Sequence, residues 1–235
     1  MAPVTEAAII AHGQPGDPAP LQAQIDELAV RVAAELGGGW VVHGATLACG
    51  CSVRRAARAQ LVYPVFMAEG WFTRSELPRR LGMAGAADYT VLQPLGLDPA
   101  MPQIGLDLAL DSAASAGIDP ATAELVVVGH GSQKSRGSAT ATRAFADALA
   151  ASGRFRGVTC GFIEEEPFFA RLQITGPAIC LPFFATTAGH VSEDVPQGWE
   201  AIGNPGPIAP AIGTAAAIPA CIAAALTAAR RQNAA

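Results

Sequence analysis

The chain has 235 residues, a length that allows one large domain or two small ones and is enough to bury a substantial core. Hydrophobic residues make up 51% and charged residues 15%, a composition that excludes an intrinsically disordered chain. The net charge of −5 provides no general positive field for phosphate backbones, so nucleic acid is not an expected partner.

The sequence also indicates a compartment. The longest nearly uncharged stretch is only about a dozen residues, short of the roughly 20 that a membrane-spanning helix needs. Glu6 lies where an export signal would have basic residues. We therefore expect a cytoplasmic protein without a membrane partner. The five cysteines are an odd number in a reducing compartment and are expected as free thiols, and the spacing of Cys49 and Cys51 is too short for a Cys-x-x-Cys redox motif.

Apolar runs of strand length alternate with helical patterns along the chain. Strands are expected at residues 7–11, 40–47, 61–68 and 89–95, with helices at 21–36 and 101–116. The same order then starts again, with strands at 124–129, 158–163 and 179–185 and helices at 139–151 and 219–231. The strands are continuously apolar, which predicts parallel sheets covered on both faces.

The two halves of the chain keep fixed offsets between their motifs. His12-Gly13 matches His130-Gly131 at an offset of 118, and Pro64 matches Pro182 at the same offset. We therefore expect an α/β fold of two similar lobes, each a parallel sheet flanked by helices, related by internal duplication. The boundary is predicted near residue 118, which gives lobes of residues 1–118 and 119–235.

The histidines are distributed unequally between the lobes. His130 follows a buried strand and is expected at the carboxyl edge of a parallel sheet, where open α/β folds bind ligands, and His190 is expected at the same edge. Imidazole binds divalent first-row metals and accepts protons near neutral pH. The alternative is that each is a loop histidine bonded to backbone. Lobe one has His12 but Trp71 in place of the second histidine, and His43 is expected as a strand histidine with a satisfied hydrogen bond.

Three motifs of the second lobe resemble the CbiX and SirB sirohydrochlorin chelatases. They are residues 127–132, residues 161–164 followed by Pro167, and residues 181–196, in that family's order and approximate spacing. Lobe one follows the same plan more weakly at residues 11–17 and 63–72. The resemblance implies insertion of Co²⁺ or Fe²⁺ into sirohydrochlorin or a related tetrapyrrole, in cobalamin or sirohaem biosynthesis. It implies no organic cofactor, the metal ion being a substrate, and two imidazoles also accept Ni²⁺.

The resemblance also implies site residues. His130 would accept protons and bind the metal, and His190 would be the second metal ligand, so that both are catalytic. Glu164 would contact the substrate, with Glu165 and Glu166 as alternatives, and the substrate-binding loop would comprise Ala185, Thr186, Thr187, Ala188, Gly189 and His190.

The residues themselves suggest further contacts. Sirohydrochlorin carries many carboxylates, for which the backbone N–H groups of Gly131 and Ser132 and the side chains of Lys134 and Arg136 are suitable donors. The secondary candidates are His12, Trp71 and Glu193, the last of which would orient His190.

Three functions remain to be compared at this point. The first is a chelatase, monomeric or homodimeric, with one site in the cleft between the lobes built mostly from lobe two. The second is a non-catalytic metal or tetrapyrrole carrier, suggested by Trp71 and by the polar pair Thr186-Thr187. The third is phosphoryl transfer, which a strand ending in His-Gly superficially suggests; histidine phosphatases resemble Arg-His-Gly, whereas Ala11 and Gly129 precede the histidines here.

Overall fold

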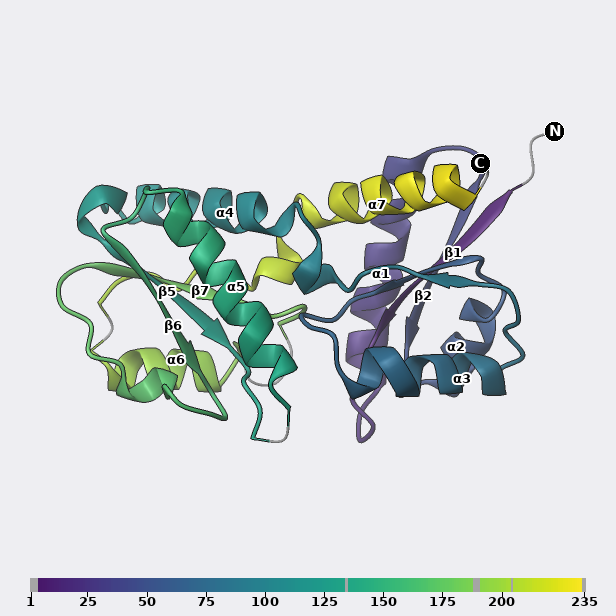
Figure 1. Ribbon diagram of the computed structural model, residues 1–235, viewed down its shortest axis with the longest axis horizontal. Helices are drawn as coiled ribbons and strands as arrows, with labels where there is room; N and C mark the ends of the chain where they lie inside the picture. The colour runs from purple at the N-terminus through teal and green to yellow at the C-terminus, as the bar shows by residue number, and fades with distance from the viewer. Residues whose placement is uncertain (1–3, 134, 188–190, 204, 234–235) are drawn as a thin grey trace. The chain divides into compact units, whose positions relative to one another are not determined.

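A computed structural model describes residues 4–133, 135–187, 191–203 and 205–233 (Figure 1). The chain forms two compact units. Unit 1 comprises Met1–Leu95 together with Ala216–Ala235, and unit 2 comprises Gly96–Ala215. Within the described ranges, each helix is too short or too polar to cross a membrane.

Unit 1 is built on a parallel sheet of four strands in the order β2-β1-β3-β4. The strands are β1 (Thr5–Ala11), β2 (Trp40–Thr46), β3 (Leu61–Pro64) and β4 (Thr90–Val91). The helices are α1 (Ala19–Leu36), α2 (Gly50–Ala56), α3 (Leu77–Met83) and α7 (Ile218–Asn233). A short π-helical turn, Phe72–Glu76, leads into α3.

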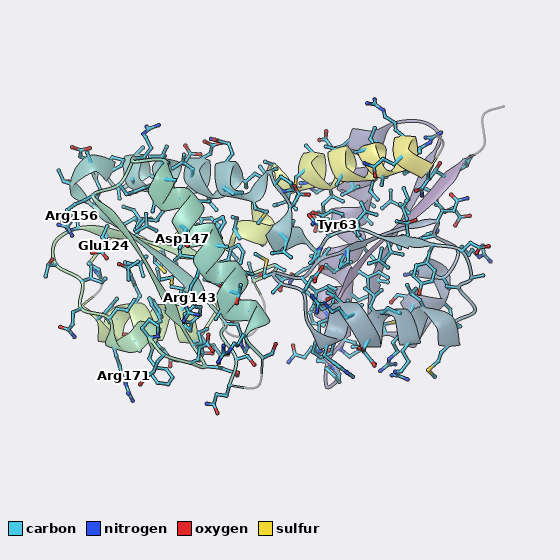
Figure 2. The ribbon with its side chains drawn as sticks, viewed as in Figure 1. Tyr63, Glu124, Arg143, Asp147, Arg156 and Arg171 are labelled. Carbon is cyan, nitrogen blue, oxygen red and sulfur yellow. The ribbon has the colours of Figure 1, made fainter. Side chains whose placement is uncertain are left out.

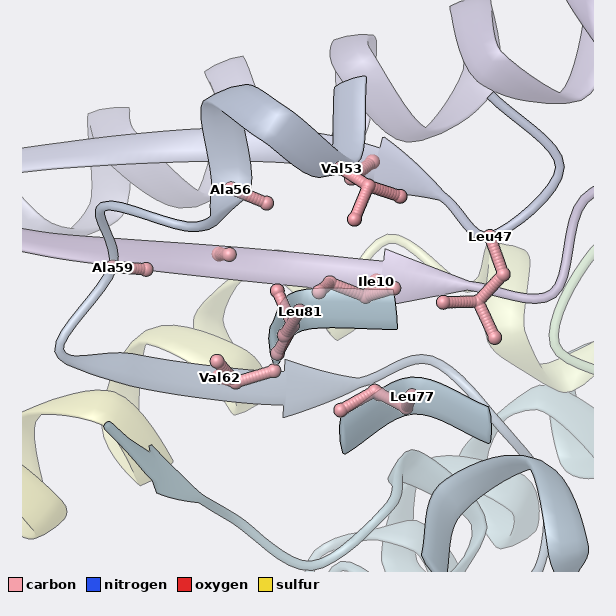
Figure 3. Close-up of a cluster of buried hydrophobic side chains, with 10 residues drawn as sticks. Ile10, Leu47, Val53, Ala56, Ala59, Val62, Leu77 and Leu81 are labelled. Carbon is pink, nitrogen blue, oxygen red and sulfur yellow. The ribbon is translucent and has the colours of Figure 1, made fainter. Parts of the chain in front are cut away.

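One buried hydrophobic cluster of unit 1 lies between the sheet and the helices α2 and α3 (Figure 3). Ile10 and Val62 project from neighbouring strands, and Leu77 and Leu81 project from α3 to meet them. Each of these four side chains is fully buried, which removes apolar surface from water and fixes α3 against the sheet. Helix α7 packs against α1 in the same unit and crosses it at a steep angle (Figure 1).

Unit 2 repeats this plan with the strand order β6-β5-β7. Its strands are β5 (Glu124–Gly129), β6 (Gly157–Phe162) and β7 (Ala178–Pro182), and its helices are α4 (Met101–Ser115), α5 (Gly137–Ala151) and α6 (Asp194–Ala201). The central strand is β1 in one unit and β5 in the other, and each pairs with the next two strands of its own repeat. The predicted α/β class and the parallel sheets are therefore confirmed.

The units divide the chain differently from the predicted boundary at residue 118. Helix α4 packs against α5 and β7, so it belongs to unit 2, while α7 packs against α1 and β3 in unit 1. The last helix of each sequence repeat, α4 or α7, thus packs in the unit formed by the other repeat. The Gly117-Ile118 segment, which resembles a linker in sequence, is the capped end of α4, where Ile118 N–H donates to the carbonyl of Ala113.

Two polar pairs lie away from the carboxyl edges of the sheets. His43 Nε2 lies 2.8 Å from Glu6 Oε2 on the neighbouring strand, so the predicted satisfied strand histidine is confirmed. At the start of β5, Glu124 lies 3.5 Å from Arg156 (Figure 2). These pairs are structural.

Candidate active site

His130 directly follows strand β5 and therefore lies at the carboxyl edge of the unit 2 sheet. The strand is buried from Leu125 to Gly129, and the chain then turns at Gly131 with a φ of +73°. Glycine suits that left-handed conformation. The packing also leaves no room for a larger residue, because a Cβ at Gly131 would lie 2.8 Å from Glu165 Cγ and 2.9 Å from Phe162 Cβ. The His130-Gly131 turn is therefore closely packed against the end of β6.

The ring of His130 is oriented by its own turn. Nδ1 lies 3.0 Å from the carbonyl oxygen of Gly131. Because a carbonyl oxygen only accepts, Nδ1 carries the proton and the lone pair of the neutral ring is on Nε2. The side chain is 39% exposed. The backbone hydrogen bond expected for an ordinary loop histidine is thus present. The same bond leaves Nε2 unprotonated, which is the tautomer that can bind a metal ion or accept a proton at that atom.

Glu164 is placed beside His130 by an extension of the β5–β6 ladder. Ile163 N–H donates to Gly129 (3.2 Å), and Glu164 N–H donates to His130 (2.9 Å). The Glu164 Oε2 atom then lies 3.7 Å from His130 Nδ1. Both side chains are accessible, so water screens the attraction between them.

The three consecutive glutamates have different surroundings. Glu164 is exposed, whereas Glu165 packs beneath Gly131, and its Oε1 atom is buried with no hydrogen-bond partner among the described residues. The carbonyl of Glu166 accepts a hydrogen bond of 3.4 Å from Arg143 of α5, whose guanidinium also lies 4.7 Å from the centroid of the Phe162 ring (Figure 2). Arg143 thus holds the glutamate segment to the sheet.

A hollow of about 480 Å³ opens beside this pair. It is lined by Ser132, Gln133, Ile163, Glu164 and Phe168. A second hollow of about 260 Å³ shares Ile163 and Phe168 and reaches α6 at Asp194 and Gln197. Apolar walls with a few polar groups are typical of ligand sites. Of the three glutamates, Glu164 is the one that lines the hollow at the His130 edge.

The second predicted motif is described in part. Ala185 follows β7 in close contact with the chain at Gly213, whose N–H donates to Phe184 (2.9 Å). Thr186 is half-buried and Thr187 is exposed. Ala188, Gly189 and His190 lie outside the described residues, as does Lys134. Glu193 is exposed at the start of α6. The described part of the chain holds no group of three or more His, Cys, Asp or Glu side chains able to bind a metal ion.

The equivalent edge of unit 1 has the same turn with different side chains. His12 Nδ1 donates to the carbonyl of Gly13, which has a φ of +83°. Ala48 N–H donates to the carbonyl of His12 (3.2 Å), so Ala48 occupies the place that Glu164 has in unit 2. The His12 ring lies edge-on to Phe72, with 4.0 Å between centroids, and Trp71 is 62% exposed. Unit 1 therefore keeps the histidine without the neighbouring carboxylate.

Comparison with known proteins agrees with this arrangement. The model of the CbiX family matches residues 124–229. A solved structure of CbiX, described as the terminal enzyme for biosynthesis of siroheme in denitrifying bacteria, is 46% identical, with a TM-score of 0.88, and the match covers 95% of this chain and 99% of that one. The chain belongs to the CbiX family.

This CbiX-family chain also matches more distant proteins, one by sequence and one by fold. A probable sirohydrochlorin cobaltochelatase of Halobacterium salinarum is 26% identical over 177 residues, which cover 62% of this chain and 59% of that protein. The matched segment thus spans about three fifths of that relative. The structure of SirB from Bacillus subtilis with Fe³⁺ is 11% identical, with a TM-score of 0.74 and coverage of 95% and 94%, and it shows a common fold.

Several residues at this edge escape prediction from the sequence. Gln133, Ile163 and Phe168 line the hollow, and Arg143 donates to the carbonyl of Glu166 in the neighbouring glutamate segment. Ile163 and Phe168 read as ordinary core residues, and Arg143 reads as a surface charge on a helix. The signal that would have found them is the strand register, since Phe162 pairs with Gly129 and so places the residues after β6 next to His130.

Proposed function

We propose that this CbiX-family protein is a chelatase that inserts a divalent metal ion, Co²⁺ or Fe²⁺, into sirohydrochlorin. The observation that carries the proposal is the His130–Glu164 pair at the carboxyl edge of the unit 2 sheet, with Nδ1 protonated by its bond to Gly131 and a carboxylate oxygen 3.7 Å away. This pair combines a metal-ligating nitrogen with a group that stabilises a proton on the ring.

The reaction requires two pyrrole protons to leave as the ion enters the macrocycle. Nε2 of His130 is the atom that holds either the incoming ion or a departing proton. When it takes a proton, the ring becomes an imidazolium, and the Glu164 carboxylate, 3.7 Å from Nδ1, compensates that charge while the Nδ1–H stays bonded to Gly131. A weakly held ion suits the task, because a site with four protein ligands would retain its metal.

His190 and the loop of residues 185–189 complete the proposal. His190 is assigned as the second metal ligand, and the loop, with Gly131 and Ser132, as the contact surface for the macrocycle and its carboxylates. These assignments rest on the motif that the chain shares with the family.

The test is a spectroscopic assay of metal insertion. Purified protein is mixed with sirohydrochlorin and Co²⁺, Fe²⁺ or Ni²⁺, and the absorbance change is compared with that of the same mixture without protein. H130A and H190A are each expected to lower the rate by at least 100-fold, the lower end of the range for loss of a positioned acid–base group. H43A is the matched control, since His43 lies within the unit 1 sheet and contacts Glu6, and its rate should be unchanged.

Two outcomes contradict the proposal. Near-normal rates in both H130A and H190A would remove the site from the reaction. Stoichiometric binding of metal or tetrapyrrole by the wild type, with no acceleration of insertion, would identify a carrier instead.

A further inference from the structure

The Cys49-Gly50-Cys51 segment of unit 1 places two thiols in direct contact. Their Sγ atoms lie 2.8 Å apart. Cys51 is exposed and Cys49 is half-buried, so small molecules reach the pair from solvent. The fold brings them there because Ala48 and Cys49 close the turn after β2, where Cys49 N–H donates to the carbonyl of Thr46 (3.0 Å).

The surroundings of Cys49 favour a thiolate. The Cys51 thiol and the backbone N–H of Ser52 donate hydrogen bonds to its sulfur, and these lower the pKa of Cys49 to about 7. A larger share of Cys49 is therefore ionised at neutral pH than of an ordinary cysteine, whose pKa is near 8.5. The thiolate is the nucleophilic form of cysteine.

The remaining cysteines differ. Cys180 and Cys221 are buried, and burial raises the pKa of Cys180 and of the half-buried Cys160. Buried thiols with raised pKa values react slowly with external reagents. The chain therefore has one pair of reactive, mutually accessible thiols among three less reactive ones.

We infer that Cys49 and Cys51 form a redox-active dithiol that exchanges with low-molecular-weight disulfides and closes to a reversible disulfide. The Cys49 thiolate attacks one sulfur of the external disulfide, whose S–S bond breaks and releases one thiolate. Cys51 then attacks Cys49, losing its proton to solvent and expelling the second thiolate. Two electrons pass from the protein to the small disulfide, which leaves as two thiols after each takes up a proton.

Contact between the sulfurs favours this step over metal binding. Two thiolates that share a metal ion are held apart by it, at about 2.3 Å from the ion for zinc. The two sulfurs of this segment lie 2.8 Å apart, closer than two ligands of one tetrahedral zinc ion would lie. A disulfide between such close neighbours at the exposed start of α2 belongs to the labile class rather than the structural one.

The test uses the reduced full-length protein and bis(2-hydroxyethyl) disulfide at pH 7. After acid quenching, denaturation and alkylation with iodoacetamide, trypsin releases residues 32–54, which contain Cys49 and Cys51, separately from residues 157–171, which contain Cys160. We expect the first peptide to lose two hydrogen atoms and take up no iodoacetamide, while the second is alkylated. Dithiothreitol should reverse the change.

Three variants sharpen the result. C51S is expected to stop at a mixed disulfide on Cys49, because the resolving thiol is gone. C49S is expected to react at least threefold more slowly than the wild type. The thiolate of Cys49 is less nucleophilic than one of higher pKa, but its larger thiolate fraction has the greater effect on the rate. C160S is the matched control and should behave as the wild type. The inference is overturned if both thiols of the wild type remain alkylatable, or if it stops at the mixed disulfide. A third outcome would assign a metal site instead and would also overturn the inference. In that outcome the wild type shows a thiolate charge-transfer band with Co²⁺ that C49S lacks, and its two thiols do not react with the disulfide.

Discussion

Glu164 lies beside His130 because a backbone hydrogen bond of 2.9 Å joins its N–H to the histidine carbonyl. The Oε2 atom of Glu164 then lies 3.7 Å from Nδ1 of His130. The same backbone bond joins Ala48 to His12 in unit 1, where no carboxylate results. The duplication has therefore kept the backbone geometry in both units and the acidic group in one.

Replacing Glu164 by glutamine tests the role of its charge. E164Q keeps the size of the side chain but removes the group that stabilises the protonated ring, so we expect metal insertion to slow by about 10- to 100-fold. The rate is measured by the absorbance of sirohydrochlorin. E200Q, at an exposed position of α6, is the matched control. Equal rates for the two variants would assign no role to the Glu164 charge.

Replacing Gly131 by alanine tests the packing of the histidine turn. Gly117 has a similar φ of +66° but open space around its Cβ position, whereas a Cβ at Gly131 would lie 2.8 Å from Glu165 Cγ. We expect G117A to cost about 1 kcal/mol and G131A about 2 to 4 kcal/mol in the free energy of unfolding. Urea denaturation measures the free energy of unfolding of both variants. Equal losses would show that Glu165 and Phe162 move aside for the added methyl group without destabilising the fold.

Glu76 predicts a dependence of stability on pH. Hydrogen bonds from Arg79 and then Arg80 lower the pKa of this carboxyl to about 2, against an ordinary value of 4.5. A lowered pKa stabilises the fold above pH 4.5, and the contribution is lost as the pH falls from 4.5 to 2. E76Q should therefore melt at a lower temperature than the wild type at pH 7, with the difference shrinking below pH 4.5.

Thermal melting between pH 3 and pH 7 measures this difference. The control is E69Q, because Glu69 and its partner Arg74 are both well exposed and such pairs contribute little to stability. If E76Q lost the same amount of stability at every pH, the loss would be one of packing rather than of charge.

Trp199 tests the core that supports α6. Its indole N–H donates to the carbonyl of Gly206 (2.7 Å), and its ring stacks on Phe169 with 6.0 Å between centroids. W199F leaves the Gly206 carbonyl without this donor, so we expect a loss of about 2 to 4 kcal/mol in the free energy of unfolding. W71F, at an exposed position, should change it by about 0.5 kcal/mol or less. Similar losses at both positions would contradict the burial of Trp199.

The elements that the sequence predicts well are those with long apolar runs. The strand at 124–129 agrees residue for residue, and the helix at 21–36 is found as Ala19–Leu36. Helices α2 and α3 are seven residues each, too short for a helical period to be seen. The strand expected at 89–95 is only Thr90–Val91, because the chain leaves the sheet and turns at Leu95–Leu97.

The placement of the candidate site residues follows the sequence where chemistry and motif coincide, while their roles stay a prediction. His130, Glu164 and Ser132 lie at one edge of one sheet, as the repeat offset and the family resemblance imply. The exchange of α4 and α7 between the units leaves no trace in the repeat pattern, because a helix shows the same apolar stripe whichever sheet it covers. Arg143 escapes prediction for a similar reason, since its partner is a backbone carbonyl.

The exchange of the last helices affects the order in which the protein is made. Unit 2 is one continuous segment, whereas unit 1 needs its final helix from the far end of the chain. A ribosome therefore completes unit 2, which contains His130, before it completes unit 1, and the partially covered sheet of unit 1 waits for α7 to emerge. Apolar surface on α1 and β3 stays open to chaperones or to other chains during that interval.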